Sequence, residues 1–442
     1  MNLKENNFLV IGLGTTGIEA IKFLRKSGAS VKATDNKKLE LLPSEVTGLI
    51  NQGIEIETGS HNPQLFDWAD IIVPSPGVSF NIKELDNAKK KGKKIISEIE
   101  LAYTSITKPI IGITGTNGKT TTTSLVAEIL KESGKKIFTG GNIGTPLITI
   151  AGNDQDYDYI LLELSSFQLQ GIDRFKPYIG AILNISPNHL DHHKNIQEYI
   201  DSKFNLFKNQ GVEDWVIYNN EDELVSSKSA DFKAKKISFG LKDKNSDVHT
   251  ADSKIYFKDS SFALDSVKLL GTHNTENIMA AISIAKIVGC DDEVIQNSIN
   301  NFNPLPHRIE YISTVKGVDI YNDSKSTSPD ATLRAIESLN SPIILVAGGK
   351  DKGTDYKVLK EIINKKVKHL VLIGESRAKM KEQLGKRVYT TVANSLEEAL
   401  NSALDSSEPK DTLLFSPACS SFDMFKSYEE RGRKFKEIVQ NI

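Results

Sequence analysis

The sequence predicts an α/β protein of three domains, each with a mainly parallel sheet between layers of helices. Two apolar runs end in glycine-rich loops and continue as helical patterns, within residues 8–28 and 108–134. Further along, three apolar stretches at 342–349, 369–374 and 411–418 alternate with helical patterns. Strands that alternate with helices are typical of parallel sheets covered by helices. A length of 442 residues leaves room for several domains, each with its own core.

The composition indicates a soluble globular protein. Hydrophobic residues make up 39% and charged residues 25% of the chain, and the formal net charge is -2. This charge gives no reason to expect nucleic acid or an anionic membrane as a partner. The start, MNLKENNFLV, does not read as a signal peptide, and no apolar run approaches the roughly 18 residues of a membrane span. With only Cys290 and Cys419, the chain fits a reducing cytoplasm.

The first block, residues 1–97, is predicted to be a Rossmann-like domain. Its stretch FLVIGLGTTG carries Gly12, Gly14 and Gly17 in the pattern G-x-G-x-x-G, and Asp35 ends the next apolar stretch. Such a loop lets the backbone approach a pyrophosphate, and an acid about 20 residues further on can take a ribose hydroxyl. The pattern alone leaves three alternatives open: a dinucleotide, another phosphorylated nucleotide, or a plain strand-to-helix turn.

A second loop of this block follows the apolar strand in DIIVPSPG, residues 70–77. Pro74, Ser75, Pro76 and Gly77 predict a rigid loop at the carboxyl edge of the sheet, where open α/β sheets bind ligands. A tight turn without a ligand is the alternative.

The second block, residues 98–304, is predicted to be a P-loop ATPase-like domain. In TGTNGKTTTT the glycines free backbone amides for phosphate oxygens, Lys119 can reach the terminal phosphates, and the Thr120 hydroxyl suits magnesium. The strict spacing G-x-x-x-x-G-K-[ST] fails by one residue, because Ile113 stands where its first glycine would be. The strand, loop and helix context still favours ATP binding. After about residue 225, short charged stretches predict a small antiparallel insertion.

Polar residues at the ends of the next two strands indicate a metal site. YILLE places Glu163 at a strand end, as expected of the acid that accompanies a phosphate loop. NHLDHH, residues 188–193, adds His189. Zinc is an alternative, but no cysteine supports a closed tetrahedral site, and carboxylates with phosphate favour magnesium. For His192 and His193 we expect a polar helix start rather than a ligand role.

The third block, residues 305–442, is predicted to be a second Rossmann-like domain with a doubly wound sheet. Its strands lie in PIILVAGG, HLVLIG and DTLLFSPA, with a helical pattern between each pair. Pro304 and Pro306 mark its boundary with the second block.

Together these motifs resemble those of the Mur ligase family, the ATP-dependent amide ligases that build the peptide of bacterial cell walls. The resemblance covers essentially the whole chain and is carried by GLGTTG, PSPG, GTNGKTTT, GGNIG, ELSSFQL, NHLDHH, YIDSKFNLF, HNTEN, PHRIE, NDSKST, GGKDKG and SPACSSFDMFKSYEERG. The family's own loop has the GTNGKT form, so Ile113 does not argue against ATP. Within the family, the first block and the last motif resemble members that add D-glutamate to UDP-N-acetylmuramoyl-L-alanine.

The resemblance implies an ATP-dependent ligase that joins an acid to a D-amino acid through an acyl phosphate, in peptidoglycan precursor synthesis, and hence in cell shape and division. It also implies a monomer in the bacterial cytoplasm. The residues expected to bind ATP are Gly115, Thr116, Asn117, Gly118, Lys119, Thr120, Thr121, Asn274, Asn277, Arg308, Asp323 and Lys325. Asn274 and Asn277 are three residues apart at a helix start, and therefore lie on one face.

By the same resemblance, the glycine loop of the first domain receives the UDP of the substrate rather than a dinucleotide. The residues expected to surround the UDP-linked substrate are Thr15, Thr16, Asp35, Asn36, Lys37, Gly77, Asn142 and His189. D-Glutamate is expected to meet Lys325, Thr327, Lys352, Ser421, Phe422 and Tyr428. Lys352 and Thr327 suit one of its carboxylates, and Ser421 with the backbone at Phe422 suits the other.

The catalytic residues implied are Lys119, Glu163, His189 and Lys203, and the ligands of Mg2+, in two sites, are Thr120, Glu163, His189 and Lys203. Lys203 stands where relatives carry a carbamylated lysine, whose anion can bridge a metal. Its helical pattern alone would favour a solvent-exposed lysine. His192 stands where relatives often have arginine, which leaves its role open, and Cys419 has no base motif that would make it a nucleophile.

Three alternatives stay open on the sequence alone. A nicotinamide-dependent dehydrogenase would account for the glycine loop and Asp35, but not for Lys119 and Glu163. A nucleotide-gated binding module would bind ATP tightly without turnover. Inside the family, enzymes that add L-alanine, a diamino acid or a dipeptide share the central domain.

Overall fold

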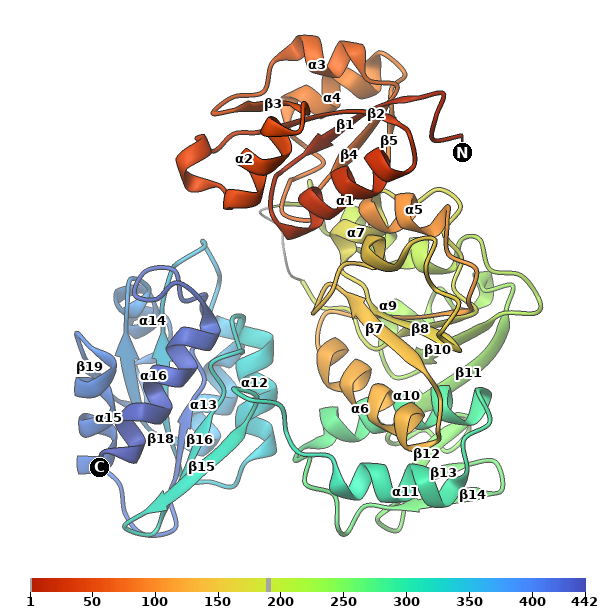
Figure 1. Cartoon of the computed structure of the whole chain (residues 1–442). Coiled ribbons are helices and arrows are strands. Elements are labelled where there is room, and N and C mark those ends of the chain that lie inside the picture. Colours follow the sequence, from red (N-terminus) through yellow and green to blue (C-terminus); the bar gives the residue numbers. More distant parts are fainter. Residues whose placement is uncertain (1, 188–191) are drawn as a thin grey trace. The chain divides into compact units, whose positions relative to one another are not determined.

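A computed structural model describes residues 2–187 and 192–442 of the chain (Figure 1). The chain divides into two compact units. The first unit comprises Met1–Leu264 and Glu276–Ile299, and the second comprises Asp265–Thr275 and Asn300–Ile442. The described residues form sheets of five and nine strands in the first unit and a sheet of six strands in the second. Across these residues, no helix combines the length and the apolar character needed to cross a bilayer.

The five-stranded sheet is parallel and has the strand order β3-β2-β1-β4-β5. Its elements are β1 (Asn7–Ile11), α1 (Thr15–Lys26), β2 (Ser30–Asp35), α2 (Ser44–Asn51), β3 (Glu55–Thr58), α3 (Pro63–Trp68), β4 (Ile71–Pro74), α4 (Lys83–Lys90) and β5 (Lys94–Ile95). Alternate residues of β1 enter opposite cores: Phe8 and Val10 enter one, Leu9 and Ile11 the other. The strand order reverses between β1 and β4, so the loops that follow these strands flank a switch point. The predicted Rossmann-like sheet is confirmed.

The nine-stranded sheet has the order β14-β13-β12-β11-β10-β9-β6-β8-β7. Its strands are β6 (Ile110–Thr114), β7 (Ile137–Gly141), β8 (Tyr159–Glu163), β9 (Ile179–Ile182), β10 (Trp215–Asn219), β11 (Lys235–Gly240), β12 (Val248–Ala251), β13 (Lys254–Phe257) and β14 (Ser260–Ala263). The helices of this region are α5 (Glu98–Tyr103), α6 (Lys119–Glu132), α7 (Ser166–Gln170), α8 (Ile196–Phe204), α9 (Glu223–Ser226), α10 (Thr272–Ile287) and α11 (Asp292–Asn301). The predicted antiparallel insertion is present as β12 to β14. Within the region after residue 225 where only antiparallel pairing was expected, β11 instead pairs in parallel with β10.

The six-stranded sheet has the order β15-β16-β20-β17-β18-β19, with only β15 antiparallel to its neighbour among these strands. Its elements are β15 (Glu310–Val315), β16 (Val318–Asn322), α12 (Pro329–Ser338), β17 (Ile343–Gly348), α13 (Lys360–Lys366), β18 (Val367–Ile373), α14 (Arg377–Leu384), β19 (Tyr389–Val392), α15 (Leu396–Asp405), β20 (Thr412–Phe415) and α16 (Tyr428–Gln440). Residues of α12, α13 and α14 pack on one face, and residues of α15 and α16 on the other (Figure 1). The doubly wound sheet predicted for this region is confirmed.

Candidate active site

The loop between β6 and α6 has the backbone of a phosphate-binding loop. Gly118 caps α6 with φ +83°, and Gly115 has φ +152°. A Cβ on Gly118 would lie 2.1 Å from Oδ1 of Asn277. Residues with a side chain rarely adopt these φ values, so the two glycines are required for the loop to turn into the helix. The amides at the start of α6 have no partner within the helix, and with the helix dipole they favour an anion there.

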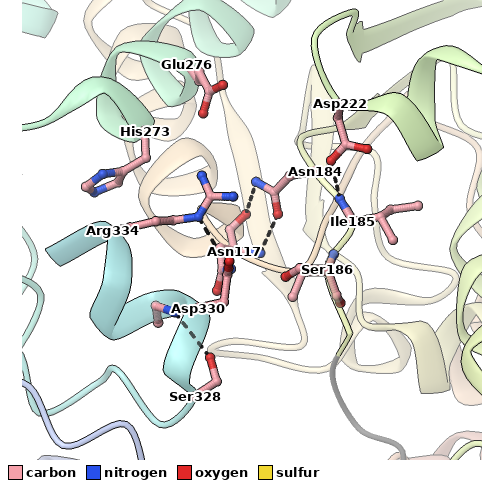
Figure 2. A network of polar contacts seen from close by, with 12 residues as sticks. Asn117, Asn184, Ile185, Ser186, Asp222, His273, Glu276, Ser328, Asp330 and Arg334 are labelled. Atoms are coloured by element: carbon pink, nitrogen blue, oxygen red, sulfur yellow. Dashed lines mark hydrogen bonds and ion pairs between the residues drawn. The ribbon is translucent and has the colours of Figure 1, made fainter. Parts of the chain in front are cut away.

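Asn184, which follows β9, braces this loop from the side. The backbone N–H of Asn117 donates to Oδ1 of Asn184 at 2.8 Å, and Nδ2 of Asn184 donates to the Asn117 carbonyl at 3.2 Å (Figure 2). The next residue is held too, because Ile185 N–H donates to Asp222 Oδ2 at 2.7 Å (Figure 2). We did not predict these bracing residues. The polar Asn184 at the end of the apolar run YIGAIL was the signal that could have found them.

Two lysines converge on the loop. Lys119 Nζ donates to the carbonyls of Gly115 and Thr116, both at 2.9 Å, and Lys203 Nζ donates to the Gly115 carbonyl at 2.8 Å. Lys203 is only 1% exposed, with Nζ 4.8 Å from the ring centre of Tyr199. A solvent-exposed Lys203, which its helical pattern alone favoured, is therefore wrong. Tyr199, Ile200 and Ser202 of α8 are buried as well.

Burial lowers the pKa of Lys203 well below its usual value, and the positive charge of Lys119 lowers it further. The carboxylate of Glu163 acts in the opposite direction and raises it. Lys203 is thus a buried amine that interacts electrostatically with Lys119 of the loop and with Glu163 at the end of β8. A lysine of this kind is neutral, and hence nucleophilic, over a wider pH range than a surface lysine.

Glu163 at the end of β8 is 2% exposed. Asn142 Nδ2 donates to its Oε1 at 2.7 Å, while Oε2 is buried without a hydrogen-bond partner among the described residues. A buried carboxylate oxygen without a partner is costly unless a cation compensates it. Its place beside the phosphate loop fits a hard divalent cation such as Mg2+.

The other predicted ligands of Mg2+ are Thr120, His189 and Lys203. Thr120 lies in the first turn of α6, and His189 falls outside the described residues. Within residues 2–187 and 192–442, no three His, Cys, Asp or Glu side chains are grouped as a metal site. Mg2+ needs no such cage, because it usually takes one or two carboxylates together with water and substrate phosphates.

His193 does not lie at a polar helix start. Helix α8 begins at Ile196 and is capped by Asn195, whose side chain accepts from the N–H of Glu198. His193 is 3% exposed, and its Nε2 lies 2.9 Å from Ser166 Oγ. The histidine therefore joins the segment before α8 to α7.

The glycine loop of the five-stranded sheet is closed by Asp35. Leu13 N–H donates to Asp35 Oδ2 at 2.7 Å, and Lys37 N–H donates to Oδ1 at 2.9 Å. Both oxygens of the acid expected at a ribose thus also hold the backbone of two loops. From the other side, Ser75 Oγ donates to the Gly12 carbonyl at 2.8 Å. The PSPG loop therefore supports the glycine loop.

Helix α1 packs against this loop at its first turns. A Cβ on Gly17 would lie 1.9 Å from the Gly12 carbonyl oxygen, whereas nothing lies within 4 Å of a Cβ on Gly14. The third glycine of the motif thus allows close packing of helix and loop, and the second leaves open space. Thr15 and Thr16 form the first turn of α1, whose N-terminal end favours an anion. Asn36 and Lys37 follow β2, and Gly77 follows β4.

In the second unit, Asp323 is buried just after β16. Ser416 Oγ donates to its Oδ2 at 2.7 Å, and Ile309 N–H donates to Oδ1 at 3.3 Å. Burial raises the pKa of Asp323 to about 6, although these hydrogen bonds and the charge of Arg308 act against the rise. Two residues on, Lys325 Nζ lies 3.8 Å from the ring centre of Tyr428. The structure thus brings together two residues expected in the D-glutamate pocket.

The other residues expected in that pocket lie on loops after neighbouring strands. Thr327 and Lys352 are exposed after β16 and β17, while after β20 Ser421 is 2% and Phe422 67% exposed. Asn274 and Asn277 both lie on α10, as their spacing predicted.

Fold and site define a class: a three-sheet α/β enzyme whose second sheet carries a loop with the backbone of a phosphate-binding loop. Three family models match, described as "Mur ligase MurD-like, N-terminal domain" over residues 6–97, "Mur ligase middle domain" over 113–285, and "Mur ligase, glutamate ligase domain" over 307–419. The chain belongs to the Mur ligase family.

Curated relatives match along the full length. The UDP-N-acetylmuramoylalanine--D-glutamate ligase of Citrifermentans bemidjiense is 42% identical over 445 residues, which cover 100% of this chain and 98% of the relative. A protein of the same name from Alkaliphilus oremlandii is 41% identical over 453 residues and 100% of both chains.

Solved structures share the fold. A pseudomurein peptide ligase type C from Methanothermus fervidus has a TM-score of 0.64 and 21% identity, over 99% of this chain and 100% of that chain. A MurF ligase from Thermotoga maritima in complex with ADP has a TM-score of 0.62 and 16% identity, over 100% of this chain and 99% of that chain.

Proposed function

We propose that the chain catalyses the ATP-dependent joining of D-glutamate to UDP-N-acetylmuramoyl-L-alanine. The substrates are supported by the shared name of full-length relatives at about 40% identity. One observation carries the chemistry: Lys119 and Lys203 meet at the Gly115 carbonyl, and Lys203 is electrostatically coupled to the buried Glu163. Such a cluster suits the transfer of a phosphoryl group between two anions.

In the first step, a carboxylate oxygen of the substrate's alanyl group attacks the γ-phosphorus of ATP, the bond to the β,γ-bridging oxygen breaks, and ADP leaves. Both reactants are negatively charged. The amides of residues 115–120 and the ammonium of Lys119 would stabilise the charge on the transferred group. When bound, Mg2+ would neutralise phosphate charge, held by Thr120, Glu163, His189 and a carbamylated Lys203.

In the second step, the amino group of D-glutamate attacks the acyl carbon. A tetrahedral intermediate forms, it expels inorganic phosphate, and the amine loses a proton. The loops after β16, β17 and β20 would bind the two carboxylates of the amino acid through Lys325, Thr327, Lys352, Ser421 and the backbone at Phe422. The chain would thereby fix the amine close to the acyl phosphate, so much of the catalysis is positioning.

We assign the glycine loop of the five-stranded sheet to the UDP of the substrate. Two observations support this assignment: the N-terminal end of α1 has backbone N–H groups that would favour a diphosphate, and nothing lies within 4 Å of a Cβ on Gly14. Such a substrate is used in the bacterial cytoplasm, where we expect the enzyme to act as a monomer. Sedimentation velocity at micromolar concentration would check the monomer.

We propose carbamylation of Lys203, which is supported by the burial and the lowered pKa of its amine. The neutral amine attacks the carbon of CO2, a new N–C bond forms, and loss of one proton leaves an anionic carbamate. With 13C-labelled bicarbonate, we expect one slowly exchanging carbonyl signal in the NMR spectrum of the wild-type chain. The signal should be absent from Lys203→Met and retained in Lys194→Met, which alters an exposed lysine.

The deciding experiment measures ADP release with Mg2+ and UDP-N-acetylmuramoyl-L-alanine across D-glutamate, L-glutamate, L-alanine, L-lysine and diaminopimelate. We expect release with D-glutamate only, and loss of it in Lys119→Met. Release with a different amino acid would assign the chain to another reaction of the family. Tight ATP binding without release under any acceptor would support a nucleotide-gated module, and binding of NADH at low concentration would support a dehydrogenase.

A further inference from the structure

Arg431 is the largest side chain that is fully buried in the described part of the chain. It lies on the first turn of α16 and is 1% exposed. Its Nε donates to Ser324 Oγ at 3.0 Å, Nη2 to the Ser324 carbonyl at 2.7 Å, and Nη1 to the Cys419 carbonyl at 3.0 Å. All three acceptors are neutral oxygens. Burial lowers the pKa of Arg431 to about 10, although the charges of Asp423 and Asp323 act against the fall, so the guanidinium stays charged at neutral pH.

A buried cation with only neutral acceptors is an expensive way to fill a core. The burial of Arg431 is therefore better explained by the backbone segments that its guanidinium connects than by a gain in folding stability. Its flat fork of donors can bind two backbone segments at a fixed angle, which neither an aliphatic side chain nor a lysine ammonium can do.

The segments that Arg431 connects are loops at the same edge of the six-stranded sheet. Ser324 belongs to the loop after β16, and Cys419 to the loop after β20, its direct neighbour. The loop after β17 passes close by, because a Cβ added to Gly349 would lie only 3.2 Å from Arg431 Nη1. One guanidinium therefore binds the loops after β16 and β20 and lies next to the loop after β17.

The same loops are also joined to each other. Lys350 N–H donates to the Ser420 carbonyl at 2.9 Å, which links the loop after β17 to the loop after β20. The Cys419 thiol lies 3.1 Å from Tyr356 Oη and 3.2 Å from Ser376 Oγ. Cys419 is thus held by its carbonyl on one side and by its sulfur on the other. This gives the buried cysteine a structural role without any nucleophilic chemistry.

These three loops are also the ones that carry the residues assigned to D-glutamate. Ser324 immediately precedes Lys325, Cys419 stands two residues before Ser421, and Gly349 stands three residues before Lys352. A dicarboxylic amino acid has two anionic groups whose separation is limited by the length of its side chain. Groups that bind both must keep a matching separation, and here they come from different loops.

We infer that Arg431 is a positioning residue for the amino-acid substrate. From inside the domain, it sets the spacing of the three loops that bind the two carboxylates. The inference rests on the proposed function, because it takes the amino acid to be D-glutamate. Because Arg431 is only 1% exposed, it would act through these loops and not by contact with the substrate. Its removal should weaken the use of the amino acid while leaving the UDP-linked substrate, assigned to the first unit, unaffected.

The test compares Arg431→Lys with Arg433→Lys, an exposed arginine two residues further along the same helix. For each variant, KM for D-glutamate, ATP and the UDP-linked substrate is measured, with kcat and the thermal unfolding midpoint. A displacement of about 1 Å in a binding group can cost on the order of 100-fold. We therefore expect Arg431→Lys to raise KM for D-glutamate at least about tenfold and to reduce the preference for D-glutamate over D-aspartate. KM for the UDP-linked substrate and all constants of Arg433→Lys should match wild type.

A merely structural role would lower the unfolding midpoint of Arg431→Lys and leave its KM for D-glutamate unchanged, and that result would overturn the inference. An equal rise in KM for all three substrates would overturn it too. If Arg431→Lys does not fold, Ser324→Ala removes one acceptor of the guanidinium and should raise KM for D-glutamate selectively. An unchanged KM in that variant would count against the inference. Failure of the proposed function is seen separately, as absence of turnover by the wild-type chain with D-glutamate.

Discussion

Asn142 donates a 2.7 Å hydrogen bond to one oxygen of the Glu163 carboxylate and leaves the other oxygen buried, with no partner among the described residues. The bond fixes the orientation of the carboxylate, and its free oxygen carries the electrostatic cost of burial. An arrangement that costs stability on its own is expected where a cation binds during function. Asn142 would then orient the carboxylate, while Glu163 would bind the metal.

Glu163→Gln removes the negative charge and keeps the shape of the side chain. Metal ions contribute several kcal/mol to transition-state stabilisation, so turnover should fall about 100-fold or more. The unfolding midpoint should stay the same or rise, since a buried charge becomes neutral. ADP release measured across a Mg2+ titration, together with thermal unfolding, checks both points. Glu132→Gln, at an exposed position at the end of α6, is the matched control. Wild-type turnover and Mg2+ dependence in Glu163→Gln would contradict the assignment.

The glycine loop of the five-stranded sheet allows a paired test. Gly17→Ala places a methyl group 1.9 Å from the Gly12 carbonyl oxygen, a clash that no rotamer can relieve. Helix α1 must move, and the free energy of unfolding should fall by about 1–3 kcal/mol. Gly14→Ala meets nothing within 4 Å and should cost at most about 1 kcal/mol, as expected at an N-cap.

The two variants should also differ in their binding of the UDP-linked substrate. The methyl group of Gly14→Ala enters the space assigned to the UDP diphosphate, so KM for the UDP-linked substrate should rise while the fold persists. Urea unfolding and substrate kinetics on both variants give the comparison. If Gly14→Ala binds the substrate as well as wild type, the diphosphate does not lie at the head of α1.

Lys203→Met should raise the stability of the chain at pH 7 and abolish its activity. The pKa of Lys203 is lowered in the folded chain, so the unfolded chain binds more protons, and stability rises with pH between the folded and unfolded pKa values. Methionine removes this dependence. In bicarbonate-free buffer, we expect Lys203→Met to be more stable than wild type at pH 7, with a smaller difference at pH 9.5, and to lack turnover. Urea unfolding at both pH values checks the prediction, with Lys194→Met as the exposed control. If Lys203→Met is less stable than wild type at pH 7, the hydrogen bond from Lys203 to the Gly115 carbonyl compensates the cost of burying the amine.

The features that could be predicted from the sequence are those encoded locally. The glycines at 115 and 118 and the acid at the end of YILLE are read directly, because a turn with positive φ and a strand end leave marks in a few adjacent residues. The sheets follow from the alternation of apolar strands with helical patterns. The direction of β11 was missed because alternation gives the faces of a strand and not the direction of its neighbour.

Contacts between segments that are distant in the sequence could not be predicted from such local patterns. Lys203 on α8 looked solvent-exposed because a helical pattern does not show which polar residue faces a loop almost 90 positions earlier. Asn184 and Arg431 were missed for the same reason, since each acts on the backbone of remote loops. The resemblance to a family gave Lys203 a role, whereas Arg431, although part of the motif SPACSSFDMFKSYEERG, received none, and neither did Asn184. His189 lies outside the described residues and stays a prediction.

Glu98 on α5 provides a test of buried charge away from the site. It is 2% exposed, its Oε1 accepts from Ile148 N–H at 2.6 Å, and its Oε2 has no partner among the described residues. Burial raises its pKa from 4.5 to about 7, although the Ile148 amide acts against the rise. Between pH 4.5 and about 7, the folded chain therefore keeps a proton on Glu98 that the unfolded chain releases. The stability due to this proton is complete below about pH 4.5 and is lost as the pH rises through about 7, by an amount on the order of 3 kcal/mol.

Glu98→Gln keeps the acceptor for Ile148 and cannot ionise. We expect its free energy of unfolding to match wild type near pH 5 and to exceed it near pH 8, because only the wild-type chain must bury a charge at the higher pH. Urea unfolding between pH 4.5 and 8.5 provides both curves. Glu100→Gln is the contrasting variant, since Glu100 Oε2 accepts from the N–H groups of Asp173 and Phe175, and loss of these bonds should destabilise the chain at every pH. Parallel curves for wild type and Glu98→Gln would mean that the Glu98 carboxyl group ionises in the folded chain as easily as in water, and that its environment is more polar than its burial indicates.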